Sequence, residues 1–304
     1  MAISRAQLVK ELEPGLNALF GLEYKRYENQ HAEIYNEESS DRAFEEEVML
    51  SGFANANVKV EGSGVNYDQS QETYTARYTH DTIALAFAIT EEAIEDNLYD
   101  RISSRYTKAL ARSMSNAKQV KAAAPLNNGL PTADGFDSGD GVSLFNTAHT
   151  TVSGTNVKNT LTTQADLNET SLEQALIDIA AFTDERGLRV AAKGVKMIIP
   201  SANQFSAERL LKSQGRTGTA DNDINAVASM GMVPQGYRVN NFLTDSDSWY
   251  IITDCPNGMK MFTRAPLTTA MEGDFDTGNV RYKARERYSF GVSDYRGIFG
   301  CEGA

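Results

Sequence analysis

One helical repeat constrains the fold of this chain more than any other feature. Between residues 90 and 123, apolar side chains recur every four positions, which places them along one stripe of an α-helix. Thr90 supplies an N-cap, and acids precede basic residues in the order that the helix dipole favours. Pro125 and Gly129 predict the end of the helix. At about 1.5 Å per residue it spans roughly 50 Å, so we expect it to serve as a spine. The stripe consists of Ile94, Leu98, Ile102, Tyr106, Leu110 and Met114.

Residues 53–89, directly before this helix, have the pattern of two strands joined by a sharp turn. Valines flank Lys59 in the first half, and the turn at 61–64 contains the glycines that a tight reversal needs. The return half, around 73–89, alternates as a strand does. Few large apolar residues lie near the tip, and a hairpin that cannot bury itself needs another surface to lie on.

The first 52 residues are expected to form an arm. Leucines at helical spacing between Leu8 and Phe20 predict a short amphipathic helix, although Pro14 and Gly15 weaken it. An acidic run follows, which is usually solvated but in an arm also suits docking on a basic partner surface. The run comprises Glu37, Glu38, Asp41, Glu45, Glu46 and Glu47.

The segment after the long helix predicts a compact domain. Residues 124–165 are rich in Gly, Asn, Thr and Asp, as in a long loop. A capping box at Thr170 and Glu173 predicts a second helix. Short strands and helices then alternate up to residue 265, beginning with the buried-type strand 195–199. This mixture is typical of an α+β fold.

The final strand, residues 279–290, alternates between apolar and basic side chains. Three interpretations of its basic face stay open: it faces DNA, it meets carboxylates of the same or a neighbouring chain, or it is merely solvated. We favour the second, because the chain carries 41 acids against 29 basic residues. The basic face consists of Arg281, Lys283, Arg285 and Arg287.

Catalytic and metal-binding motifs are scarce in the sequence. It contains no nucleophile elbow, dinucleotide fingerprint, phosphate loop or HExxH motif. His31, His80 and His149 are far apart, and Cys255 and Cys301 have no ligand spacing, so we expect reduced thiols and no disulfide. The acids of 134–141 are three apart rather than two, which disfavours a calcium loop. We therefore predict no catalytic, cofactor-binding or metal-binding residues.

Charge and hydropathy argue against three further classes of protein: nucleic-acid-binding, membrane-spanning and secreted proteins. The formal net charge of −12 argues against a protein whose main task is gripping nucleic acid, although a local basic face remains compatible with it. No apolar run approaches the roughly 18 to 20 residues that cross a bilayer, and the N-terminus lacks the apolar core of a signal peptide. We expect a soluble protein made in a cytoplasm.

Several phrases, in this order, resemble major capsid proteins of tailed phages with the HK97-like fold. They are LEPGLNALFGLEY (12–24), DRAFEEEVMLSGF (41–53), YTARYTHDTIALAFAITEEAIEDNLYD (74–100), RYTKALARSMSNAKQVKAA (105–123) and RYSFGVSDYRGIFG (287–300). LFNTAHT (144–150) is similar to a phrase in major head subunits of Mu-like phages. No phrase is a chemical motif; the specificity lies in their shared order over most of the chain.

The resemblance implies an α+β HK97-like architecture whose parts carry the family's names. These are an N-terminal arm (1–52), an E-loop hairpin (53–89), a P-domain with the spine helix and an insertion loop (90–184), a compact A-domain (185–265) and returning P-domain strands (266–304).

The same resemblance implies a structural subunit, not an enzyme. Its copies form hexamers and pentamers of an icosahedral head that encloses double-stranded DNA, assembled in the bacterial cytoplasm. Expected partners are portal and decoration proteins, DNA by proximity, and a separate scaffold protein, because only about 50 residues precede the hairpin. Covalent Lys–Asn crosslinking through Lys59 is not expected. The predicted inter-subunit contacts are Val58, Lys59, Glu61, Arg281, Lys283, Arg285 and Arg287.

Three alternatives remain at this level. The first is the shell protein of an encapsulin-type nanocompartment, which has the same fold. The second is a soluble hydrolase that uses carboxylates, and the third is a tail or head-completion protein. Particle contents, turnover and particle size distinguish them.

Overall fold

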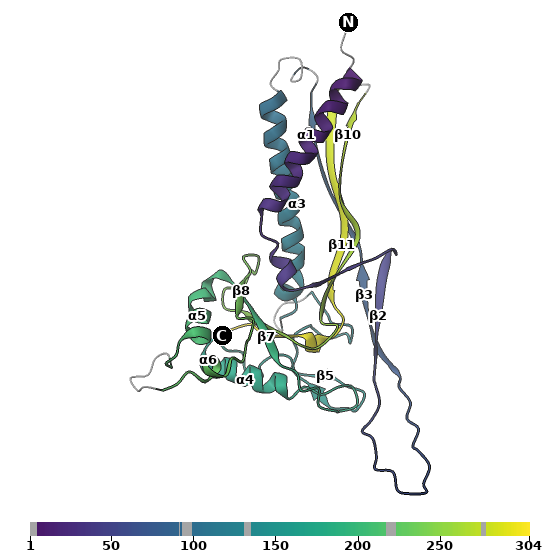
Figure 1. The fold of residues 1–304 in the computed structure, drawn as a ribbon, viewed down its shortest axis with the longest axis vertical. Helices are drawn as coiled ribbons and strands as arrows, with labels where there is room; N and C mark the ends of the chain where they lie inside the picture. Colours follow the sequence, from purple (N-terminus) through teal and green to yellow (C-terminus); the bar gives the residue numbers. More distant parts are fainter. Residues whose placement is uncertain (1–4, 91, 93–98, 131–134, 217–222, 275–277) are drawn as a thin grey trace.

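The computed structural model describes residues 5–90, 92, 99–130, 135–216, 223–274 and 278–304. It has three parts (Figure 1): a long arm of two helices against a sheet, a compact domain below it, and a projecting ribbon. The mixture of helices and strands agrees with the predicted α+β class.

Two helices cover one face of the sheet in the long arm (Figure 1). They are α1 (Arg5–Arg26) and α3 (Tyr99–Asn128). The sheet order is β1-β10-β11-β4, and only the β1–β10 pair is parallel. The strands are β1 (Asn36–Ser39), β10 (Met259–Gly273), β11 (Val280–Val292) and β4 (Asp81–Ile89).

The apolar stripe of α3 packs as its spacing predicts. Leu110 and Met114 are buried against Phe20 of α1 and Tyr282 of β11. Tyr106 differs, because it is 52% exposed and its ring lies tilted against the Phe87 ring, with the centroids 5.7 Å apart. Ile94 and Leu98 of this stripe lie outside the described residues, and so does the predicted start of the helix after Thr90. The backbone of Ile102 belongs to α3, but its side chain is not described.

The long helix ends directly before Gly129, as predicted, but not at Pro125, because tertiary burial outweighs the local cost of the proline ring. Pro125 does not end α3, which continues to Asn128. Proline removes one helical hydrogen bond, but the following Leu126 is fully buried in the compact core and holds that turn in place. The predicted helix near the N-terminus is confirmed as α1, which runs through Pro14 for 22 residues.

The compact domain is built on a second sheet of order β12-β9-β7-β8. Trp249, Tyr250 and Phe299 fill its core. The strands are β7 (Gly194–Ile199), β8 (Tyr237–Val239), β9 (Trp249–Thr253) and β12 (Ile298–Cys301). Around it lie α4 (Glu169–Ala180), α5 (Gln204–Lys212), α6 (Ala226–Met230), the short pair β5 (His149–Thr150) and β6 (Asn156–Val157), and the single turns η1 (Gln30–Glu33), η2 (Ser201–Asn203) and η3 (Tyr295–Gly297).

Two local expectations in this part need correction. The segment 266–304 does not stay with the long arm, because β12 pairs with β9 in the compact domain. The cap of α4 is Asn168 rather than Thr170: the Asn168 side chain accepts from the Ser171 N–H, and Ser171 closes a reciprocal bond. An asparagine two residues earlier competes for the same role, since both residue types cap helices.

The projecting ribbon begins and ends earlier than residues 53–89. It consists of β2 (Phe44–Leu50) paired with β3 (Glu72–Thr79), whereas β4 pairs with β11 instead. Residues 51–71, all of them described, form no strand. The turn prediction is correct, since Gly62 has φ +79° and the Ser63 N–H bonds to the Val60 carbonyl at 3.1 Å.

Candidate interaction surfaces

The tip of the ribbon leaves apolar side chains in water. Val58 is 94% exposed and Tyr67 is 97% exposed, and Val60 and Val65 are also exposed. Burying one such valine contributes about 1.5 kcal/mol or more. The tip therefore gains several kcal/mol from any surface that covers it.

The base of the ribbon, in contrast, is bound firmly to the long sheet. The Tyr78 and Ser293 hydroxyls are hydrogen bonded, and Ser293 also donates to Glu47 of β2. Lys260 of β10 contacts both Glu47 and Glu38. Burial acts to lower the pKa of Lys260, but the hydrogen bonds to Glu47 and Glu38 outweigh it and raise the pKa. The ribbon thus projects from a fixed base.

The outer face of β2 combines apolar and acidic side chains. Alternate residues of this strand point outward, and three of them are exposed apolar residues at Phe44, Val48 and Leu50. Glu46 lies between them and forms an ion pair with Arg77 at 3.7 Å. The guanidinium of Arg77 also stacks over the Phe44 ring at 4.1 Å.

The four basic residues of the last long strand lie together, as predicted. Tyr282 and Ala284 of β11 pack against α1 and α3, so the basic residues that alternate with them lie on the opposite face of the sheet. Arg281 forms an ion pair with Asp274. Lys283 and Arg285 have no ion pair among the described residues. We name this surface the basic stripe: Arg281, Lys283, Arg285 and Arg287.

Small residues flank the basic stripe. On β4 the residues paired with it include Ala84, Ala86 and Ala88, and on β10 Thr268 and Ala270 lie opposite Arg285 and Lys283. The long basic side chains therefore rise from a shallow surface that another strand is able to approach. The predicted hairpin residues Val58, Lys59 and Glu61 belong to the segment 51–71 between β2 and β3, which projects away from the long sheet of the same chain (Figure 1).

The covered face of the same strand contains a charge that the sequence pattern left unexplained. Glu286 interrupts the apolar face, and its carboxylate lies 3.6 Å from Lys118 of α3 and 3.4 Å from the Tyr24 hydroxyl of α1. Burial raises the pKa of Glu286, against the opposing effect of Lys118. This buried pair connects both helices to the sheet.

The family model for phage capsid proteins matches residues 73–300, which include the long helix, the compact domain and the basic stripe. The chain belongs to this family of phage capsid proteins. No curated protein matches the sequence.

Solved structures agree with the fold of this capsid protein. The capsid of an empty GTA particle has a TM-score of 0.59 at 14% identity, with 91% of each chain covered. The capsid of Myoviridae phage XM1 has a TM-score of 0.54 at 13% identity, with 89% of each covered. A virus-like particle from Pyrococcus furiosus has a TM-score of 0.52 at 10% identity, covering 94% of this chain and 98% of that one. The chain therefore has the HK97-like capsid fold.

The histidines of this capsid protein have structural partners. His31 bonds to Gln119, His80 to Ser40 and Ser289, and the fully buried His149 to Asp140 at 2.6 Å and to Asn159. Asp140 is thereby occupied, while Asp134 of the acidic loop lies outside the described residues. Within the described part of the chain, no group of three or more His, Cys, Asp and Glu residues is placed to hold a metal ion.

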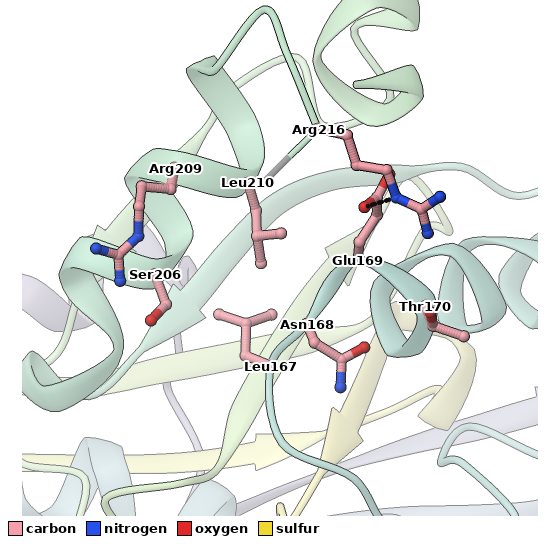
Figure 2. Close-up of a pocket in the computed structure, with 8 residues that line it drawn as sticks. All are labelled: Leu167, Asn168, Glu169, Thr170, Ser206, Arg209, Leu210 and Arg216. Atoms are coloured by element: carbon pink, nitrogen blue, oxygen red, sulfur yellow. Dashed lines mark hydrogen bonds and ion pairs between the residues drawn. The ribbon is translucent and has the colours of Figure 1, made fainter. Parts of the chain in front are cut away.

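A hollow in the compact domain lies between the start of α4 and α5 and has a volume of about 690 Å³. Figure 2 shows the Arg216 guanidinium against the carboxylate of Glu169, at 2.8 Å. The carboxylate of Glu169 is thus bound by Arg216. Leu167 and Leu210 face the same hollow (Figure 2). Among the described residues, no helix is long and apolar enough to span a membrane.

Proposed function

We propose that this capsid protein is the major shell subunit of an icosahedral phage head. Its copies form hexamers and pentamers that enclose double-stranded DNA, and the ribbon, the long arm and the compact domain act as the E-loop, P-domain and A-domain of the family. The observation that carries the proposal is the ribbon: its base is fixed by Lys260 and Tyr78, while its tip holds exposed apolar residues that its own chain does not cover.

A neighbouring subunit offers a complementary surface. The outer face of β2 presents Phe44, Glu46, Val48 and Leu50, and the open face of the sheet presents the basic stripe with its flanking alanines. Apolar residues pack on the alanines while Glu46 meets the unpaired Lys283 or Arg285. Charge complementarity of this kind fixes register and partner choice more than affinity.

The proposed role in a phage head also implies the other partners of the subunit. A separate scaffold protein directs assembly, a portal occupies one vertex, decoration proteins bind outside, and DNA lies nearby without sequence-specific contacts. The subunit is made and assembled in the host cytoplasm and ends in the virion.

Changing all four residues of the basic stripe to glutamate tests the proposal. The variant is expected to stay folded by circular dichroism but to form no shells, because like charges then face Glu46 of the neighbour. Negative-stain electron microscopy and sedimentation of the expressed chain, alone and with its scaffold, provide the readout. Normal particles from this variant would refute the interface, and a strictly monomeric wild-type chain would refute the function.

A nanocompartment shell is a second candidate, favoured by the structural match to the virus-like particle from Pyrococcus furiosus. The contents of purified particles distinguish the two. A packaged genome supports the phage head, whereas an enclosed protein cargo without DNA supports the nanocompartment.

A further inference from the structure

One long stretch of this acidic chain contains no acid. Residues 101–133 include six basic residues and neither aspartate nor glutamate. Nearly all of this stretch belongs to α3, so the helix concentrates positive charge in a chain of net charge −12. Two of the six, Lys118 and Lys121, are neutralised by Glu286 and Asp81 of the sheet.

Three others are exposed and keep their charge. Arg105, Lys108 and Arg112 are three and four positions apart, so they project from one face of α3 in a row. No carboxylate of the described residues forms an ion pair with them. The row extends over about 10 Å along the helix axis.

The row borders a hollow of about 520 Å³ between α1 and α3. Ser113 and Asn116 of α3 line it beside Lys108 and Arg112. The acid of this hollow, Glu23, has a mostly buried side chain and is bound by Arg26 at 3.5 Å, and the Tyr27 hydroxyl also donates to it. The charge left uncompensated at this surface is therefore positive.

We infer that this row and hollow bind the phosphate backbone of double-stranded DNA on the inner side of the shell, an inference that rests on the proposed function. Arginine, lysine, serine and asparagine are the side chains that contact phosphates without reading sequence. A protein partner would require buried apolar anchors at the centre of its interface, and the lining offers little beyond Ala109 and the Tyr27 ring.

The remaining charge of the chain shapes how this contact works. The excess of acids repels DNA at long range from most of the remaining surface. In the proposed shell a neighbouring ribbon covers the basic stripe, which leaves the α3 row for the contact. Three phosphate contacts bind weakly in each subunit. The shell repeats the row many times, so the DNA is held collectively while each contact still releases easily as the genome moves.

The test measures binding of a fluorescein-labelled 30-base-pair duplex to the full-length unassembled chain by anisotropy between 50 and 200 mM NaCl. The variant is Arg105→Gln/Lys108→Gln/Arg112→Gln. For this variant, the slope of the log of the binding constant against the log of the salt concentration is expected to be shallower by about 2.7 than for wild type. Wild type should therefore lose about 40-fold more affinity than the variant between 50 and 200 mM NaCl. The matched control, Arg189→Gln/Lys193→Gln/Arg209→Gln, removes the same charge from scattered exposed positions of the compact domain and should bind DNA as wild type does.

Three results would overturn the inference: an unchanged salt slope in the α3 variant, an equal loss of DNA binding in the compact-domain control, or tighter binding of an acidic peptide spanning residues 36–50 than of the duplex. Electron microscopy of the wild-type chain beside the α3 variant separates the two proposals. Shells that form without row-dependent DNA binding refute this inference alone, whereas wild-type subunits that never form shells refute the proposed function.

Discussion

Removing Lys118 leaves Glu286 as a buried charge without a cation. The side chains of the pair are 16% and 3% exposed, respectively, so water hardly replaces the lost partner. Breaking a buried pair in this way costs about 3 to 5 kcal/mol, and we take about 3 because Lys118 is partly solvated. For a chain of this length, Lys118→Met should lower the Tm by about 5 °C at pH 7.

The stability lost in Lys118→Met should depend on pH in a defined direction. Burial already raises the pKa of Glu286 above 4.5, and loss of Lys118 raises it further. A raised carboxyl pKa gives stability that is fully present below the unfolded pKa and is lost as the pH rises through the folded pKa. The deficit of Lys118→Met is therefore largest at pH 7 and shrinks toward pH 4.5.

Scanning fluorimetry of the unassembled chain between pH 4.5 and 7.5 measures both effects. Lys121→Met is the matched control on the same helix, because its pair with Asp81 is exposed and such pairs contribute about 1 kcal/mol or less. The double variant Lys118→Met/Glu286→Leu should recover most of the loss, since an apolar pair avoids burying charge. A Lys118→Met variant that melts with wild type at pH 7, or a deficit that grows on acidification, contradicts the reasoning.

Two further variants address the ribbon. In Gly291→Ala, the new Cβ would lie 2.6 Å from the Tyr78 ring, so the base of the ribbon should loosen and the free energy of unfolding should fall by about 1 to 3 kcal/mol. Limited proteolysis should then cleave faster within residues 44–79, and an unchanged cleavage rate argues against this prediction. In Val58→Ser/Val60→Ser, both changes lie on exposed residues, so the Tm should stay within about 1 °C while light scattering shows a higher protein concentration needed for assembly. If this variant assembles at the wild-type protein concentration, the ribbon tip does not contribute to the interface between subunits.

The features that the sequence predicted well are those set by local periodicity. The alternation along β11 placed Arg281, Lys283 and Arg285 on one face, and the four-residue repeat placed Leu110 and Met114 in the core. Both patterns follow from the geometry of one element, so they need no knowledge of its neighbours.

Strand partners were less accessible to sequence reasoning. Residues 81–89 continue the β pattern of 72–79 without interruption, yet His80 marks the point where the chain leaves the ribbon and joins β11. The partner of Glu286 was missed for the same reason, because Lys118 lies 168 positions away in the sequence. Such pairings are decided by tertiary packing, which no local pattern encodes.

The position of β12 affects the order in which a newly made subunit matures. The sheet of the compact domain includes Ile298–Cys301, and the fully buried Phe299 belongs to its core. A ribosome adds roughly 5 to 20 residues per second, so the nascent chain spends about 3 to 10 s with Trp249 lacking its neighbouring strand. The compact domain closes only after residue 301 has emerged from the ribosome. A prematurely terminated product keeps an open, apolar sheet edge, which directs it to chaperones and proteases before it is able to join a growing particle.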